Sequence, residues 1–346
     1  MTVAELNLTT GYFWLDTVIK VAIALGFMMT LALPVIYAEL KVMAHMQNRV
    51  GPYYAGGRFG WAQPIADGLK FLQKEDLVPR DADAAVYKAA PAVVVMATFA
   101  VFIVIPLGPQ VVVRDMDIGI FYLLAISSIG VLGVLMAGWS SANKYSLIGG
   151  LRAAGQLIAY ELPLILAALA VVIQAGTMSL VGIVEAQGEP LFTIGSVPIS
   201  LPYLLTGQIV SFVIFVIAMV AELSRIPFDM PFAESELTMG YVTEYSGIRF
   251  AMFFLGEYAS LIALSLVVAT LFLGGYWIPV IPDDWLNLIG PMVVMGKASL
   301  VIFFVLWIRS TFPRLREDQL QTMAWHWLIP LALVNLLVIS FVKVVV

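Results

Sequence analysis

The chain contains no cysteine among its 346 residues and only two histidines, His45 and His326. Without cysteine it forms no disulfide bond, no thiolate-ligated iron–sulfur cluster and no zinc site with Cys ligands. The histidines fall on a loop and at the start of an apolar run, so they are not expected to ligate a haem inside a membrane. The sequence also has no Gly-rich phosphate-binding loop and no dinucleotide fingerprint. We therefore expect a chain that carries no redox cofactor of its own.

Charge is scarce as well, which identifies the class of protein. Charged residues make up 12% of the chain and hydrophobic residues 61%, and the mean hydropathy is +0.97. Soluble domains have about 25% charged and 45–50% apolar residues. The composition predicts an all-α membrane protein that forms one polytopic domain over residues 1–346.

Eight apolar runs are long enough to cross a membrane, which takes about 20 residues in a helix. The predicted spans of this eight-helix bundle are roughly 15–38, 87–107, 118–139, 156–176, 203–222, 250–274, 291–309 and 325–345. Lys297 interrupts the seventh span, which is the least regular of them. No internal repeat is visible, and this argues against the inverted-repeat transporter folds.

Lysine and arginine are distributed unevenly between the two sides of the predicted bundle. Loops on the side opposite the termini hold Lys41, Arg49, Arg58, Lys70, Lys74, Arg80, Lys144, Arg152, Arg225, Arg249, Arg309, Arg314 and Arg316. Loops on the side of the termini hold Arg114 alone. Because positive loops remain in the cytoplasm, we expect both termini outside a bacterial inner membrane and the long loops in the cytoplasm.

The first long loop contains a short amphipathic helix over about residues 60–75. Trp61, Ile65, Leu69 and Leu72 fall on one face of GWAQPIADGLKFLQKED, and polar residues fall on the other. Such a helix can lie in the membrane interface. The pattern is equally consistent with a helix packed on a partner protein or on the chain's own loops.

Acidic residues gather at one depth. Glu39 and Glu222 end the first and fifth predicted spans, and Glu161 and Glu257 lie inside the fourth and sixth, all in the cytoplasmic half. An ionised carboxylate in hydrocarbon costs a few kcal/mol, so such groups face the interior, pair or hold a proton. The loop at about 223–249 adds four more acids: Asp229, Glu234, Glu236 and Glu244. We expect a hydrated acidic path into the membrane, although Glu39 and Glu222 are also explained as solvated interfacial groups.

Two stretches carry a family resemblance. GWAQPIADGLKFLQKE (Gly60–Glu75) and RIPFDMPFAESEL…EY (Arg225–Tyr245) resemble the signature regions of one membrane-subunit family of NADH:quinone oxidoreductase, respiratory complex I. This is the family of the bacterial H subunit, which is called subunit 1 in other members. AELKVMAHMQNRVGP, GQLIAYELP and the GEY at Gly256–Tyr258 are similar to further parts of that family. The resemblance covers nearly the whole chain.

The resemblance implies a subunit that forms much of the quinone-binding chamber and links quinone reduction to proton translocation. It implies a proton relay of Glu39, Glu161, Glu222, Glu257, Asp229, Glu234, Glu236 and Glu244. It also implies chamber residues at Arg49, Asp67, Lys70, Glu75, Arg225, Phe228 and Phe232. The implied partners are peripheral iron–sulfur and quinone-site subunits, small and antiporter-like membrane subunits, lipid and quinone, with no nucleic acid. FMN and iron–sulfur clusters are expected on those partners.

The sequence departs from the family pattern at several positions. Phe232 stands where the first Glu after the Pro-Phe-Asp motif is usual, so one loop carboxylate is missing. Val242 stands where His is frequent, Leu40 where Arg is common, and GPYYAGGRFG is longer than the usual turn. Two alternatives are the equivalent subunit of a hydrogenase or ferredoxin-linked complex, and a stand-alone ion transporter.

Overall fold

The structure is a computed structural model that describes residues 13–109, 111–189, 192–194, 197–199, 201–232, 234–278 and 283–345. Helices dominate it, as the composition predicts. In chain order the elements are α1 (Phe13–Met46), α2 (Gln63–Gln73), α3 (Ala84–Val101), α4 (Gly119–Ser140), α5 (Lys144–Ala175), α6 (Leu180–Gly188), β1 (Phe192–Ile194), β2 (Val197–Ile199), α7 (Ile209–Glu222), α8 (Glu234–Leu237), η1 (Gly240–Val242), α9 (Gly247–Phe272), α10 (Asp283–Thr311), α11 (Glu317–Thr322), a π-helical turn η2 (Met323–Leu328) and α12 (Ile329–Val345).

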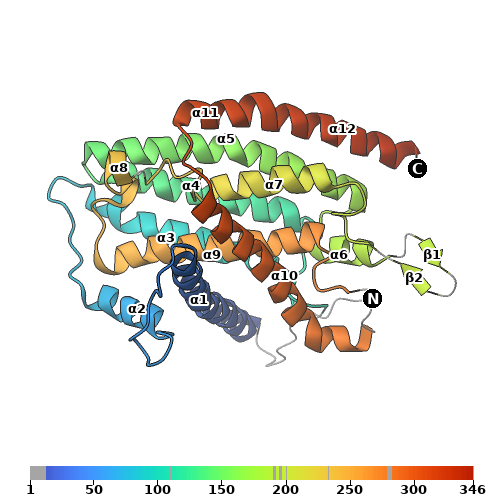
Figure 1. Ribbon diagram of the computed structural model, residues 1–346, viewed down its shortest axis with the longest axis horizontal. Helices are drawn as coiled ribbons and strands as arrows, with labels where there is room; N and C mark the ends of the chain where they lie inside the picture. Colours follow the sequence, from blue (N-terminus) through green and yellow to red (C-terminus); the bar gives the residue numbers. More distant parts are fainter. Residues whose placement is uncertain are drawn as a thin grey trace.

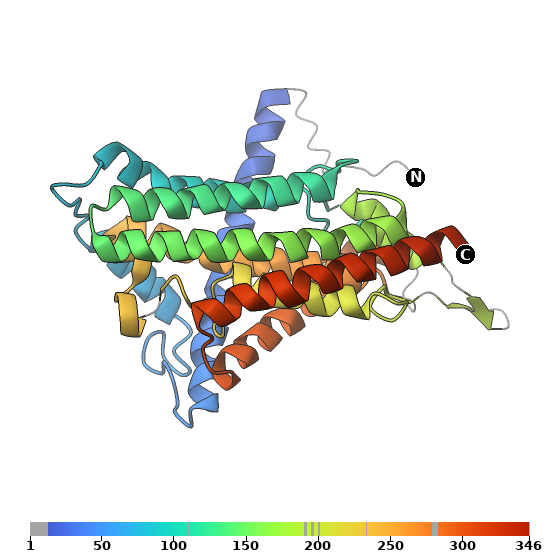
Figure 2. The same cartoon turned by 90° about the horizontal axis from the view of Figure 1, so that it is seen from above.

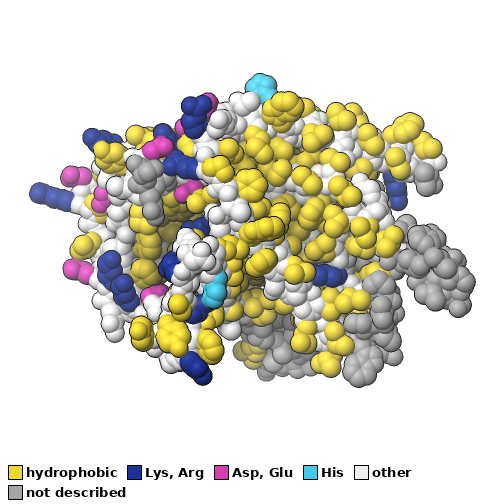
Figure 3. Space-filling view, viewed as in Figure 1, with side chains coloured by type: hydrophobic (Ala, Val, Ile, Leu, Met, Phe, Trp, Pro, Cys, Tyr) yellow, Lys and Arg dark blue, Asp and Glu magenta, His cyan; other side chains and the backbone are white. Residues whose placement is uncertain are grey.

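The long helices form one bundle. Helices α4, α5, α7, α9 and α12 run along its long axis, whereas α1 crosses them steeply and α10 runs obliquely (Figure 1, Figure 2). The connections 47–83, 141–143, 223–246 and 312–316 meet at one end of the bundle, which we call the charged end. The backbone bonds Asp83 N to Ser140 O (3.1 Å) and Leu315 N to Pro227 O (3.0 Å) join these connections. Charged side chains gather there, while the rest of the visible surface is mostly hydrophobic (Figure 3).

Seven helices of the described chain are long and apolar enough to cross a membrane. The fifth predicted span corresponds to α7, whose 14 residues are shorter than the roughly 20 that a crossing takes. The turns before α7 make up the difference, because Leu204 N bonds to Phe272 O at the end of α9 (3.0 Å). The segment from Leu204 to Glu222 thus reaches from the end of α9 to the charged end, in agreement with the predicted bundle.

Small residues allow the helices to approach closely. A Cβ on Gly138 of α4 would lie 2.9 Å from the Cα of Gly150 on α5, so the two backbones are in direct contact. Helix starts are set locally: Asp83 accepts from Ala85 N (3.2 Å) before α3, and Asn143 accepts from Tyr145 N (2.9 Å) before α5. Side-chain caps of this kind satisfy the free N–H groups of the first turn.

Lys297, which interrupts the seventh predicted span, has backbone partners inside the bundle. Its Nζ donates to Gly275 O at 2.7 Å and to Trp277 O at 2.9 Å. The ammonium group therefore satisfies carbonyls just beyond the end of α9, which explains how α10 tolerates it within an apolar helix.

Helix α2 is the predicted amphipathic helix, and its apolar face is open. Trp61, Ile65, Leu69 and Leu72 are 45–65% exposed. A different side packs on the bundle, where Pro64 is buried and the rings of Phe71 and Phe250 lie 5.5 Å apart. The alternative in which the apolar face packs on the chain's own loops is thereby excluded for the described residues.

Candidate functional site

The best-buried charges in the described part of the chain form one cluster around Arg225. This side chain, whose residue is 3% exposed, reaches Glu39 Oε2 with Nη1 (2.6 Å) and Glu257 Oε1 with Nη2 (2.9 Å). Arg309 of α10 also pairs with Glu39. We call these four residues the Arg225 cluster. Two carboxylates face two guanidinium groups, so the set can be electrically neutral, as burial in a low-dielectric interior requires.

The backbone turn after α7 places Arg225. Ser224 adopts the left-handed conformation (φ 50°), and the N–H groups of Ser224 and Arg225 bond to Ala221 O (3.0 Å) and Val220 O (3.3 Å). This is the Schellman pattern that ends a helix and reverses the chain. Gln156 of α5 fastens the turn by donating to Ala221 O (2.7 Å) and Phe228 O (2.8 Å). The chain thereby turns back beneath the end of α7 and carries Arg225 into the bundle.

Arg225 keeps unused donor capacity. Its Nε has no hydrogen-bond acceptor among the described residues, and Nη2 meets Glu257 as an ion-pair contact without hydrogen-bond geometry. The guanidinium carbon lies 4.8 Å from the centre of the Tyr258 ring, a cation–π arrangement. A buried N–H without an acceptor costs free energy, so this donor is available to water or to a polar ligand.

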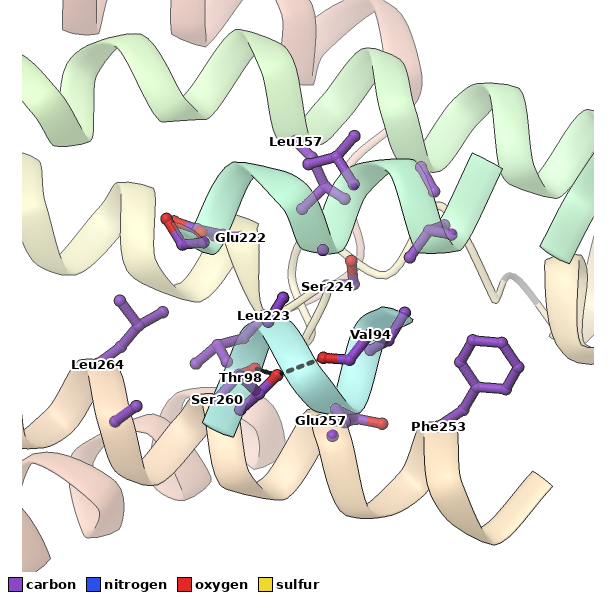
Figure 4. A pocket seen from close by; sticks show the side chains of 18 of the residues that line it. Val94, Thr98, Leu157, Glu222, Leu223, Ser224, Phe253, Glu257, Ser260 and Leu264 are labelled. Carbon is purple, nitrogen blue, oxygen red and sulfur yellow. Dashed lines mark hydrogen bonds between the residues drawn. The ribbon is translucent and has the colours of Figure 1, made fainter. Parts of the chain in front are cut away.

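A second acidic pair lies beside the first. Glu161 of α5 and Glu222 of α7 are near enough for their charges to interact, and Asp229 is near enough to act on Glu257. The structure thus brings Glu39 and Glu257 together through Arg225, and Glu161 and Glu222 together directly. Glu222 and Glu257 line one cavity of about 120 Å³ (Figure 4).

The acids of the 223–249 loop have separate surroundings. Glu236 is paired with Arg152 (2.9 Å) and Arg314 (3.2 Å). These arginines, Arg152 foremost through its hydrogen bond, hold the pKa of the Glu236 carboxyl below its usual value. Glu244 accepts from Asn143 Nδ2, and the side chain of Glu234 lies outside the described part of the structure.

Aromatic residues hold that loop against α3 and α9. The rings of Tyr87 and Tyr245 stack at 4.1 Å, with Tyr87 donating to Glu244 O (2.8 Å) and Tyr245 donating to Tyr87 O (3.1 Å). Burial raises the pKa of Tyr245 to about 12. Gly240 (φ 56°) makes the turn, since a Cβ there would collide with Pro231 O. The loop is therefore a packed part of the bundle.

The predicted chamber residues fall into two groups. Phe228 is buried against Tyr160 (5.2 Å between ring centres), and Phe232 packs on Tyr241 (5.2 Å) in the cavity wall. The others lie away from the Arg225 cluster in the first long loop or on α2. Arg49 donates to Gln47 (2.8 Å), Asp67 accepts from Gln63 (3.0 Å), and Lys70 and Glu75 are exposed.

Sequence reasoning did not assign Arg309 or Gln156 to the site. Arg309 was counted only as a loop cation, although it ends an apolar span at the level of the acids. Gln156 is a lone amide in an apolar helix, and it is 1% exposed in the structure. A polar side chain that must be satisfied inside a membrane helix is the signal that points to such positions.

Comparison with known proteins gives consistent matches. The sequence profile of the NADH dehydrogenase family matches residues 19–340. The NADH-quinone oxidoreductase H subunit 2 of Syntrophobacter fumaroxidans is 46% identical over 343 residues, which is 96% of this chain and 97% of that protein. The NADH-quinone oxidoreductase H subunit of Geobacillus kaustophilus is 46% identical over 308 residues, 89% of this chain and 88% of that protein. The corresponding protein of Dehalococcoides mccartyi is 41% identical over 330 residues, 95% of this chain and 87% of that protein.

Proposed function

Because the chain belongs to the H-subunit family of NADH-quinone oxidoreductase and is a membrane subunit of that enzyme, we propose that it couples quinone reduction to proton translocation at the Arg225 cluster. The observation that carries the proposal is the buried arrangement of Glu39, Arg225, Glu257 and Arg309, which connects to the cavity that Glu222 lines.

The proposed chamber extends from α2 and the first loop toward Arg225 and Phe228. Arg49, Asp67, Lys70 and Glu75 stand at its mouth, and Phe232 stands in the wall between the loop and the cavity. Quinone reduction takes up two electrons and two protons, so charge changes near buried carboxylates. In an interior of low dielectric, such a change acts strongly on neighbouring charges.

The acids take different parts in this proposal. Glu257, Glu222 and Glu161 form the relay, with Glu39 and Asp229 beside it. Coupled groups of this kind titrate as a unit. Glu234, Glu236 and Glu244 belong to the loop, and Glu236 acts there as a fixed anion, because its lowered pKa keeps it ionised at neutral pH.

The proposal places the charged end in the cytoplasm of a bacterial cell, with both termini outside. The electron donor is then a peripheral arm that carries FMN and iron–sulfur clusters. Small and antiporter-like membrane subunits continue the acidic path. The quinone is the substrate and the surrounding lipid is the second contact.

The test compares Glu161→Gln and Glu257→Gln in the assembled complex. Each substitution keeps the size of the side chain and removes its ability to carry a proton. We expect NADH-driven quinone reduction, measured in coupled membranes, to fall at least about a hundredfold, the usual contribution of a proton-transfer group.

Assembly is checked by the amount of the complex in native gels, which should match the wild type. Gln319→Glu, a change on exposed α11 far from the relay in sequence, serves as the control with unchanged activity. Normal quinone reduction and normal proton pumping in both Gln variants would exclude the relay.

A further inference from the structure

The cavity beside the Arg225 cluster is large enough for water. It has a volume of about 120 Å³, and one water occupies about 30 Å³ in the liquid. It lies among α3, α4, α5, α7 and α9, and its lining includes Glu222 and Glu257. Most of the remaining wall is apolar, made by side chains such as Val94, Leu123 and Leu157. Water enters such a space only where polar groups hold it.

Two hydroxyl groups provide that polar surface. Thr98 of α3 and Ser260 of α9 line the cavity, and their oxygens lie 3.2 Å apart. Thr98 donates its hydrogen to Val94 O at 3.0 Å. Ser260 must therefore be the donor to Thr98, because each hydroxyl has a single hydrogen. This leaves the lone pairs of Ser260 free to accept hydrogen bonds from water in the cavity.

The helix spacing puts this pair next to the carboxylates. Ser260 follows Glu257 by three residues on α9, and residues three apart share a helix face. Gly256, on the same turn, lets α3 approach, because a Cβ there would stand 3.1 Å from Val94 Cγ1. Figure 4 draws Thr98 and Ser260 in the space between the side chains of Glu222 and Glu257.

We propose that Thr98 and Ser260 position a short chain of waters that carries protons between Glu257 and Glu222. This inference rests on the proposed function. Protonated Glu257 gives its proton to the first water as that water gives one to the next, and the last water protonates the Glu222 carboxylate. Only O–H bonds break and form, and both hydroxyls stay neutral. Thr98 and Ser260 are positioning residues.

The first test removes the hydroxyls. Thr98→Val keeps the shape of the side chain, and Ser260→Ala removes only the hydroxyl. We expect the double variant to reduce coupled quinone reduction about tenfold in the assembled complex, with Thr98→Ser close to the wild type. Rescue by Thr98→Ser separates a hydroxyl effect from a packing effect. Ser265→Ala is the matched control, because Ser265 is buried on the same helix and donates to Leu261 O (2.7 Å) outside the cavity lining.

A wild-type rate in the double variant would overturn the inference. Glu222→Gln and Glu257→Gln are measured beside it. If these two lose activity while the double variant keeps it, the water bridge fails and the proposed function stands. If the Gln variants also keep full activity, the proposed function fails.

A second measurement needs no activity. The chain has no cysteine, so Ser260→Cys and Ser265→Cys each introduce one thiol into this protein. Methyl methanethiosulfonate should modify the thiol at position 260 at least about tenfold faster than the one at 265, since thiolate forms only where water reaches it. Peptide mass spectrometry of the chain, taken from the whole complex, reads out the modification. Equal protection of both thiols would contradict a hydrated cavity wall.

Discussion

At the scale of single residues, the account depends on Arg225, which holds acids from distant parts of the chain. Its partner Glu39 stands 186 positions earlier in the sequence. Removing one member of a buried ion pair leaves a charge without compensation, and this costs about 3–5 kcal/mol. Arg225 therefore stabilises the junction of α1, α9 and the loop after α7, whatever else it does for a ligand.

Arg225→Gln should accordingly destabilise the protein by about 3–5 kcal/mol. Arg316→Gln is the control, because Arg316 pairs with Asp318 at the surface, where both side chains are mostly exposed, and such pairs contribute about 0–1 kcal/mol. Thermal unfolding of the purified protein measures the difference between the two variants. Equal melting temperatures would show that the buried cluster is no more stabilising than a surface pair.

Glu236 gives a prediction about pH. Its folded pKa is lowered by Arg152 and then Arg314, so its contribution to loop stability is complete above the unfolded value of about 4.3. That contribution disappears as the pH falls through the lowered folded pKa. Hydrogen exchange in residues 223–246 should be faster in Glu236→Gln than in the wild type at pH 7. The difference should shrink below about pH 4, and a difference that grows there would contradict the assignment.

At the scale of elements, hydropathy predicts the helices well and their surroundings poorly. Seven predicted spans correspond to helices of crossing length, because a long apolar run has few alternatives to a membrane helix. The prediction missed α6 and the β1–β2 hairpin between the fourth and fifth spans. The stretch they occupy is apolar without a clear period, so the pattern does not distinguish helix, strand and loop there.

The Arg225 cluster shows the corresponding limit for the site. The depth of Glu39, Glu161, Glu222 and Glu257 follows from the sequence, because depth is counted along a helix. Their pairing does not follow, since it depends on how α1 and α10 cross the bundle. The Schellman turn at Ser224 was also hidden, because glycine is the usual residue at such a position.

Helix α2 allows a test of the open apolar face. Leu69 is 56% exposed, and Lys74 follows on the polar side of the same turn region. If α2 lies in the membrane interface, a spin label on Leu69→Cys should relax mainly with lipid-soluble oxygen, and one on Lys74→Cys mainly with a water-soluble nickel complex. The same response at both positions would favour a partner protein over lipid as the cover of this face.

At the scale of the whole molecule, the charged end and the Arg225 cluster belong to one structure. The loop at 223–246 is fixed to α3 by the Tyr87–Tyr245 stack, to α5 by Gln156 and to the segment before α11 by the backbone bond of Leu315. A charge change at the loop therefore acts on a rigid surface beside Glu257. This continuity supports the proposal that quinone chemistry and proton movement meet in this protein.

The most direct measurement of that central claim is labelling of the intact complex by a photoreactive quinone, followed by peptide mapping of this chain. The account predicts labelled peptides within residues 49–75 and 225–245, with labelling suppressed by an excess of unmodified quinone. Labelling confined to other parts of the chain, or labelling that unmodified quinone does not suppress, would contradict a quinone chamber at the Arg225 cluster.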